Sequence, residues 1–256
     1  MDVGRGGGKQ GCNSVVTVFK VTPQSYGDSS LKQLVNIYEF HDMHFRDQAI
    51  AVKRIFEKYH ARRVVIDANG VGAGLVDEMV ISNTDPKTGI TYPPFGVEGG
   101  SYNGWKEEYN KFRTPDMIQD AMYLIKADAP FNTESYTNVQ VQLTSGKVKF
   151  LIDERTAKAK LLSTQKGQKM TPEERAKYLK PYTLTSILEE EMVNLREETE
   201  NFNIILKPAN KGIKKDKFSS LQYALYYIKL IDDNKRKKKR KYDPSEWRKL
   251  FASVGG

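Results

Sequence analysis

An apolar run that ends in an acid, Val64-Val65-Ile66-Asp67, constrains the fold of this chain more than any other feature. β-Branched residues without polar alternation are typical of a parallel strand that is buried on both faces. Residues 70–74 contain three glycines, which predicts a tight turn into a helix that begins near Leu75. Because α/β proteins bind ligands at the carboxyl ends of such strands, Asp67 is a candidate functional carboxylate.

Two further acids lie in unusual local sequence. Asp2 precedes a glycine-rich segment, and Asp216 lies in a lysine-rich segment just before a predicted helix. If the fold brings these acids to Asp67, the three carboxylates form an all-oxygen site of the kind that Mg²⁺ or Mn²⁺ prefers. Structural alternatives remain open: Asp67 as a turn residue before Gly70, and Asp216 as the N-cap of its helix.

Length and composition limit the class of protein. The 256 residues are enough for one substantial domain. No apolar run approaches the roughly 20 residues that cross a bilayer, and the start of the chain lacks the apolar core of a signal peptide, so we expect a cytosolic protein without a membrane partner. The single cysteine, Cys12, cannot form an internal disulfide and is interpreted as a small structural residue.

The positive charge of the chain is local. The formal net charge is +9, and the run at residues 235–241 supplies seven of these charges, which leaves +2 for the rest. Such a run is either a solvated tail or a contact for a polyanion, and nucleic acid is the natural candidate. We therefore predict one folded domain at residues 1–233 and a basic C-terminal tail, with a short possible helix, at residues 234–256. The predicted DNA contacts in the tail are Lys235, Arg236, Lys237, Lys238, Lys239, Arg240 and Lys241.

A second basic cluster surrounds Asp216. Cations beside a metal-binding carboxylate suit a phosphodiester substrate, although ordinary loop solubility is the alternative. We predict phosphate contacts, not catalysis, for Lys214 and Lys215, and a further DNA contact for Lys211. The full cluster is Lys207, Lys211, Lys214, Lys215 and Lys217.

The apolar spacing predicts the order of elements. β-Rich segments at 13–21 and 34–40 indicate two antiparallel strands, and helical spacing indicates a helix from Ala49 to Tyr59. Residues 83–104 are dense in Pro, Gly and Asn and predict irregular structure. Helices are further predicted at 118–125, 184–195 and 218–228, a hairpin at 139–152 around Ser145-Gly146, and a strand at 202–206. Residues 156–182 are predicted to be polar and mobile, with a short helix after the capping box at 171–174.

Several familiar motifs do not fit. A phosphate-binding loop at the start would need Gly six residues before Lys9 and Ser or Thr after it, but Val3 and Gln10 stand there. The glycines after Asp67 match a dinucleotide fingerprint only with the third glycine displaced. Three histidines, His41, His44 and His60, have no cysteine partners at zinc-binding spacing.

The acidic segments together resemble a known family. Asp2 with its glycine-rich turn, VVIDANGVGAGLVDEM at 64–79, EYNKFRTPDM at 108–117 and KKDKFSSLQYALYY at 214–227 are similar to the nuclease domain of the large terminase subunit of tailed bacteriophages. The resemblance implies an α/β, RNase H-like fold: a mixed central β-sheet flanked by helices, here with an added β-hairpin and the basic tail. It makes Asp2 the first-strand acid, Asp67 the fourth-strand acid and Asp216 the acid at the start of the last helix.

The same resemblance implies the activity and its setting. The implied enzyme is a divalent-metal-dependent endonuclease that cleaves double-stranded DNA during viral genome packaging in the host cytoplasm. Two Mg²⁺ or Mn²⁺ ions would be held by the three aspartates, with Asp2 or Asp67 bridging and Asp216 binding one ion. The implied partners are an ATPase motor domain supplied elsewhere, the portal protein and the small terminase subunit. Asp2 normally ends an apolar strand, and this chain begins one residue before it, so that strand is expected to be absent or replaced.

Two other functions fit the same residues. Another RNase H-like nuclease, such as a junction resolvase, would share the metal chemistry and differ in the shape of its DNA substrate. A non-enzymatic DNA-binding adaptor would use the basic tail and keep the acids as structural residues.

Overall fold

The computed structural model describes residues 1–4, 13–24, 29–210 and 212–241. The predictions for Cys12, Lys211, the side chains of residues 238–241 and the segment 242–256 lie outside this part.

The strands are β1 (Ser14–Thr22), β2 (Leu31–Phe40), β3 (Val64–Asp67), β4 (Asn83–Thr84), β5 (Thr91–Tyr92), β6 (Phe95–Gly100), β7 (Ile118–Ile125), β8 (Val148–Lys149), β9 (Leu195–Glu200) and β10 (Asn203–Pro208). The helices are α1 (Phe45–Lys58), α2 (Val71–Met79), α3 (Gly104–Asn110), α4 (Ala129–Thr144), α5 (Glu154–Leu162), α6 (Gln165–Lys169), α7 (Pro172–Val193) and α8 (Asp216–Lys241). None of the described helices combines the length and the apolar character that a membrane crossing needs.

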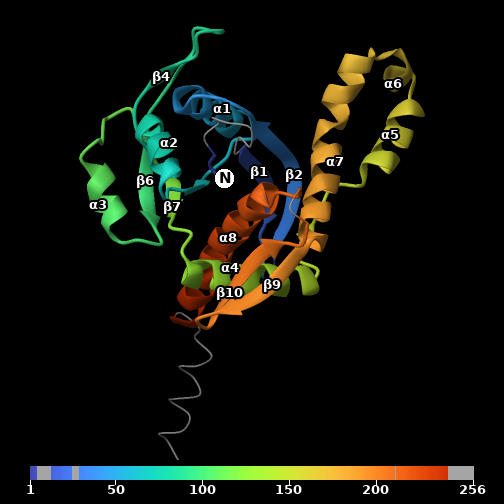
Figure 1. Ribbon diagram of the computed structural model, residues 1–256. Helices are drawn as coiled ribbons and strands as arrows, with labels where there is room; N and C mark the ends of the chain where they lie inside the picture. Colours follow the sequence, from blue (N-terminus) through green and yellow to red (C-terminus); the bar gives the residue numbers. More distant parts are fainter. Residues whose placement is uncertain (5–12, 25–28, 211, 242–256) are drawn as a thin grey trace, which may run out of the picture.

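Two three-stranded sheets form the centre of the molecule (Figure 1). In the first, β1 pairs with β2 in antiparallel register and β8 adds to β2 in parallel. In the second, β7 lies between β3 and β6, and all three strands are parallel. The parallel sheet has its carboxyl edge at Asp67, where the sequence predicts it.

The first two residues of the chain join these sheets. Asp2 exchanges backbone hydrogen bonds with Val15 of β1, at 3.0 and 2.9 Å. On the other side, the Met1 amine donates to the Val65 carbonyl at 2.6 Å, and the Asp67 N–H donates to the Met1 carbonyl at 3.2 Å. Residues 1–2 therefore link the two sheets edge to edge, in the order β8-β2-β1-(1–2)-β3-β7-β6, and this two-residue segment stands where the resemblance places the first strand.

Helices cover both faces of the mixed sheet. On one face, α1 and α2 pack against β1, β3, β6 and β7 around buried residues such as Phe56, Leu75 and Met122. On the other face, α8 packs with α4 and the inner half of α7 against β1 and β2, around Leu188, Leu221 and Leu225. The predicted fold class, an α/β mixed central sheet flanked by helices, is confirmed.

Two predicted elements in the middle of the chain have the wrong type. Residues 118–125 form the central strand β7 and not a helix. Residues 139–152 do not form a hairpin: the first part belongs to helix α4, which Asp128 caps by accepting the Phe131 N–H at 3.0 Å. The structure has a hairpin at β9 and β10 instead, which the sequence did not predict as a hairpin, although its second strand matches the predicted strand at 202–206.

Three other segments are more regular than the sequence indicates. Residues 83–104 contain β6, which pairs with β7 along the parallel sheet. Residues 154–182 form α5, α6 and the outer half of α7, and the predicted capping box is present between Thr171 and Glu174. The final helix α8 extends through Lys241, so the backbone of the basic run continues this helix beyond the proposed domain boundary at 233.

Candidate metal and nucleic-acid site

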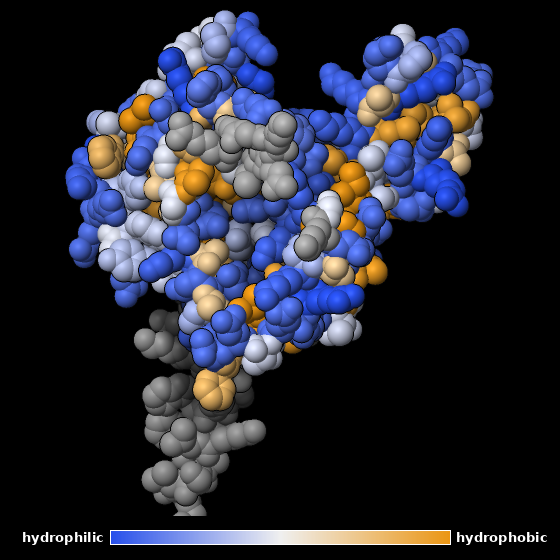
Figure 2. All heavy atoms as spheres, in the orientation of Figure 1, coloured by the Kyte–Doolittle hydropathy of each residue, from blue (hydrophilic) through white to orange (hydrophobic). Residues whose placement is uncertain are grey.

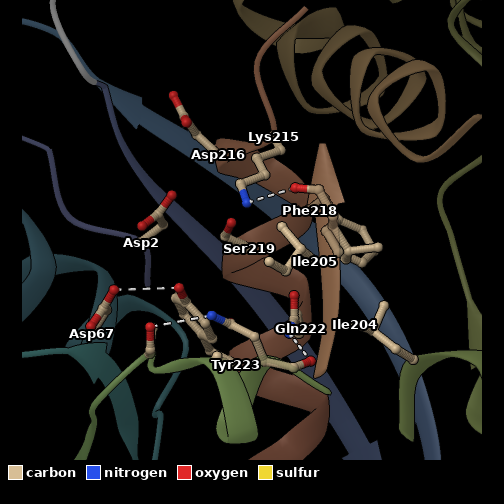
Figure 3. Close-up of a pocket in the computed structure, with 14 residues that line it drawn as sticks. Asp2, Asp67, Ile204, Ile205, Lys215, Asp216, Phe218, Ser219, Gln222 and Tyr223 are labelled. Carbon is tan, nitrogen blue, oxygen red and sulfur yellow. Dashed lines mark hydrogen bonds between the residues drawn. The ribbon is translucent and has the colours of Figure 1, made fainter. Parts of the chain in front are cut away.

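Asp2, Asp67 and Asp216 all line one cavity of about 430 Å³ (Figure 3). Asp2 lies in the segment of residues 1–2 that bridges to β1, Asp67 ends β3, and Asp216 lies in the first turn of α8. The opposite wall comes from β10 and from the start of α4, with Ile204, Ile205 and Asn132 among the lining residues. Segments from the beginning, the first third and the end of the chain therefore meet at this cavity.

The Asp67 side chain is fixed by two hydrogen bonds. Its Oδ1 accepts the Asn69 N–H at 3.0 Å, and its Oδ2 accepts the Tyr223 hydroxyl at 3.3 Å. Figure 3 shows this second contact reaching across from α8. Burial raises the pKa of Asp67, and the bonds from Asn69 and Tyr223 oppose that rise because they stabilise the ionised form.

The backbone behind Asp67 depends on glycine. Gly70 has φ +58°, a conformation that side-chain-bearing residues rarely adopt. A Cβ at Gly72 would lie 1.8 Å from the Asp67 carbonyl oxygen, so α2 can begin against the end of β3 only with glycine at this position. The tight turn predicted from the glycines is confirmed.

Among the three aspartates, Asp2 has the most strongly shifted pKa. Its pKa is raised to about 7, first by burial and then by the negative charges of Asp216 and Asp67. Each of the other two carboxylates is thus close enough to Asp2 to disfavour its ionised form. A bound cation would reverse this balance, because it stabilises the ionised form of every carboxylate around it.

A buried charge network holds the start of α8, where Asp216 lies. Lys217 donates to Glu39 of β2 at 2.6 Å and to Glu191 of α7 at 3.2 Å. Glu191 also accepts the Phe218 N–H at 2.9 Å and so caps one of the free amides of the first turn. Burial raises the pKa of Asp216, while the neighbouring Lys214 and Lys217 favour its ionised form.

Sequence reasoning missed this network and the tyrosine. Glu191 stands third in the run Glu189-Glu190-Glu191 near the end of a predicted helix, and nothing in that run separates the buried glutamate from its neighbours. Tyr223 lies about two turns into the final helix, and nothing in the sequence separates it from the neighbouring Tyr226 and Tyr227. The three-dimensional fold alone brings Tyr223 to the cavity and Glu191 to the start of α8.

The predicted basic contacts divide into two groups. Lys215 lines the cavity, and its Nζ donates to the Leu206 carbonyl at 3.1 Å. Lys214 lies beside Asp216 and lowers its pKa. The run that begins at Lys235 is about 28 Å from Asp216 along the helix axis, since each helical residue rises by about 1.5 Å. The structure therefore brings Lys214 and Lys215 to the acids and keeps the basic run away from them.

The donor chemistry of the cavity fits a hard divalent cation. Its charged acceptors are carboxylates, and no histidine or cysteine lines it among the described residues. The carboxylates do not converge on one point, however: in the described part of the chain no group of three or more His, Cys, Asp or Glu side chains is close enough to hold a metal ion. Figure 3 shows the reason, because the Asp216 carboxylate points away from Asp2.

Together, the fold and the cavity define a mixed α/β protein with acidic side chains on two adjacent central strands and at the start of a flanking helix. Two solved structures are similar to it, both crystal structures of the large terminase nuclease from thermophilic phage G20c. The one with bound cobalt has a TM-score of 0.43 and 12% sequence identity over 86% of this chain and 89% of that chain. The one with bound magnesium has a TM-score of 0.42 and 14% identity over 83% of this chain and 81% of that chain. No protein-family model and no curated protein matches the chain.

Proposed function

We propose that this protein is a divalent-metal-dependent endonuclease that cleaves double-stranded DNA during viral genome packaging. One observation carries the proposal: three aspartates from distant parts of the chain line the same cavity, and the charges of Asp216 and Asp67 help to raise the pKa of Asp2, after burial, to about 7. Crowded, half-buried carboxylates that destabilise one another are unusual in a merely structural role, and they are what a cation-binding site requires.

The three aspartates have different proposed parts in holding Mg²⁺ or Mn²⁺. Asp2 and Asp67 stand on adjacent strands and form the fixed side of the site, because both are anchored through the backbone of the sheet. Asp216 would complete the ligand set from α8 when its carboxylate, which points away from Asp2 in this structure, turns toward the other two. When bound, the ions, two in our proposal, would lower the pKa of an attacking water and neutralise charge on the leaving oxygen of a phosphodiester. Lys215 lines the same cavity and is the proposed contact for a substrate phosphate.

The setting of this activity is also a proposal. The sequence resemblance to phage terminase nuclease domains supports duplex DNA as the substrate and the host cytoplasm as the place of action. It also supports an ATPase motor domain supplied elsewhere, the portal protein and the small terminase subunit as partners. The large basic run at 235–241 is consistent with a polyanionic partner.

Plasmid digestion with Mn²⁺ or Mg²⁺ tests the proposal. We expect nicking and linearisation by the parent protein, and loss of cleavage in Asp2→Asn, Asp67→Asn and Asp216→Asn. Asp116→Asn is a matched control, since Asp116 is exposed and does not line the cavity. Cleavage that survives all three site substitutions would overturn the assignment of the site.

The same proteins separate the two alternatives. A junction resolvase would cleave a four-way junction in preference to linear duplex, whereas the proposed enzyme cleaves linear duplex. A non-enzymatic adaptor would bind DNA equally well with Asp67→Asn and would not nick plasmid with either metal.

A further inference from the structure

Helices α5 and α6 and the outer half of α7 project from the body as an arm, defined here as residues 154–182 (Figure 1). Figure 2 shows the arm standing off from the rest of the surface, with hydrophilic side chains around a narrow apolar strip. None of its residues lines the acidic cavity. The arm is therefore a separate feature, which the proposed nuclease site does not explain.

The arm is a preformed structure with its own small core. Ala157, Leu161 and Leu179 are buried together, and Met170 and Tyr182 pack against them. The bend between α6 and α7 is held by Arg175, whose guanidinium donates to the carbonyls of Gly167 at 3.1 Å and Gln168 at 2.8 Å. Side chains on the arm are thus presented on a fixed scaffold, which lowers the entropic cost of binding a partner.

The arm concentrates unpaired positive charge. Residues 154–182 contain eight Lys or Arg and three Asp or Glu, a net charge of +5. The whole chain carries +9, of which the arm supplies +5 and the run at 235–241 supplies +7, so all other residues together carry −3. Among the described residues, the exposed lysines of the arm take part in no ion pair. These lysines are Lys158, Lys160, Lys166, Lys169, Lys177 and Lys180.

Two of the three acids of the arm, Glu173 and Glu174, are engaged at the start of α7. Glu174 accepts the Thr171 N–H at 2.9 Å within the capping box of α7. The pKa of Glu173 is lowered by hydrogen bonds at the same helix start, first from its own backbone N–H and then from Thr171. Both carboxylates therefore interact with the helix N-terminus and pair with none of the arm's lysines.

Helix α7 joins the arm to the start of α8, which borders the acidic cavity. The outer half of α7 carries Lys177 and Lys180, and its inner half carries Glu191, which holds Lys217 and the Phe218 N–H beside Asp216. From Lys180 to Glu191 the helix rises by about 16 Å, roughly half of one turn of B-DNA. A duplex with a phosphate in the cavity has further phosphates at this distance along its length.

We propose that the arm is a second DNA-binding surface, which holds the phosphate backbone of duplex DNA outside the cleavage cavity through its exposed lysines. The choice of duplex DNA as the ligand rests on the proposed function, whereas the unpaired charge requires only a polyphosphate chain. Tyr178, which is 46% exposed and lies between Lys177 and Lys180 in sequence, adds a hydroxyl that can donate to a DNA phosphate oxygen.

The test is a salt titration of DNA binding in EDTA, so that neither metal binding nor cleavage contributes. The arm variant replaces Lys158, Lys169, Lys177 and Lys180 with glutamine in the full chain. The control variant makes the same replacement at four lysines that are also exposed but lie outside the arm, namely Lys20, Lys87, Lys106 and Lys111. A third variant places arginine at the four arm positions and keeps the charge.

For a labelled duplex of about three helical turns, we expect the arm variant to bind at least about tenfold more weakly near 0.1 M salt. The slope of log K against log salt should become less steep by about 3 to 4, because each phosphate contact contributes about 0.9. The control and arginine variants should keep most of the parental affinity, and circular dichroism should show an unchanged helix content for all variants.

Two outcomes would overturn the inference. One is an arm variant whose affinity and salt slope equal those of the control variant. The other is equally tight, arm-dependent binding of polyglutamate, which would identify an acidic protein as the partner. Because the titration needs no cleavage, a protein that binds DNA through the arm and never cuts plasmid would refute the proposed nuclease and leave this inference standing.

Discussion

Gly72 lies directly against the backbone of Asp67, and a Cβ on Gly72 would come within 1.8 Å of the Asp67 carbonyl oxygen. Gly72→Ala should therefore push the start of α2 away from the end of β3 and displace the Asp67 carboxylate. We expect a loss of about 1–3 kcal/mol in the free energy of unfolding, as for other overpacked positions, together with a strong loss of cleavage. Urea denaturation and plasmid digestion measure the two effects.

Gly99→Ala is the matched control for this prediction. Gly99 lies in β6, and a Cβ there has nothing within 4 Å. Its replacement should leave stability and cleavage close to those of the parent. Equal effects of the two substitutions would show that the close approach to Asp67 is not the cause.

Asp2→Asn should stabilise the metal-free protein. The raised pKa of Asp2, about 7 instead of 3.8, means that the folded state binds more protons than the unfolded state between these values. The contribution of Asp2 to stability is therefore lost as the pH rises through this window, and above it the ionised carboxylate destabilises the fold. In EDTA at pH 8 we expect Tm to rise by a few degrees, since about 1 kcal/mol corresponds to about 2–4 °C in a chain of this size.

Divalent metal should reverse the order of the two Tm values, so that the parent melts at a higher temperature than Asp2→Asn. Excess Mg²⁺ or Mn²⁺ should raise Tm of the parent, because a ligand that binds only the folded state stabilises it, and should raise Tm of Asp2→Asn much less. Scanning calorimetry with and without metal makes the comparison, with Asp116→Asn expected to follow the parent. A lower Tm for Asp2→Asn in EDTA would contradict the electrostatic account.

The strand that carries Asp67 could be predicted because its signal is local. Val64 to Ile66 form a short apolar run, and the glycines that follow fit only a sharp turn. The central strand β7 could not be recognised from the sequence, because a strand buried on both faces has no alternation of polar and apolar residues. Its apolar positions, among them Ala121, Met122 and Ile125, match helical spacing equally well.

Part of helix α4 has the sequence pattern of a strand for a related reason. Val139, Val141 and Leu143 alternate as in a strand, yet Val139 is buried in the core and Val141 is 56% exposed on the outer face of the helix. The better signal stood upstream, where Asp128 and Pro130 form a helix start. That the three acids lie at one cavity could be inferred only through the family resemblance. Their proximity depends on the order of strands in the sheet and not on local sequence.

Glu191→Ala should loosen the start of α8. The substitution removes the cap of the Phe218 N–H and leaves Lys217 with Glu39 as its acidic partner. Because Lys217 keeps Glu39, the main loss is the partner of the buried Phe218 N–H, and we expect a cost of about 1–3 kcal/mol. Urea denaturation checks the loss, and Glu190→Ala is the control because the neighbouring Glu190 side chain is exposed.

Lys53 should make stability depend on pH in the alkaline range. Burial lowers its pKa from 10.5 to about 8, while its Nζ donates to the Ile81 carbonyl and to Asn83 Oδ1, both at 2.6 Å. Between about pH 8 and 10.5 the unfolded state binds more protons than the folded state. The free energy of unfolding therefore rises with pH in this range, as the cost of burying the charged amine is relieved. The full effect is at most about 3 kcal/mol.

Lys53→Met tests this dependence by its slope and not by its absolute stability, because the substitution also leaves Asn83 without its donor. We expect the free energy of unfolding of the parent, measured from pH 7.5 to 10.5, to rise relative to that of Lys53→Met. Parallel curves for the two proteins would show that Lys53 keeps its ordinary pKa in the folded state.

Removal of the basic run should weaken DNA binding without touching the acidic cavity. Residues 235–241 lie at the far end of α8, and those whose side chains the structure describes, 235–237, do not line the cavity. A chain that stops after residue 234 should bind duplex DNA less tightly, and its salt slope should flatten by about 0.9 for each phosphate that the run neutralises. The rise in Tm with Mg²⁺ should remain, since Asp2, Asp67 and Asp216 are unchanged. A salt slope equal to that of the parent would show that the run does not bind DNA, and a missing response to Mg²⁺ would show that the end of α8 supports the site after all.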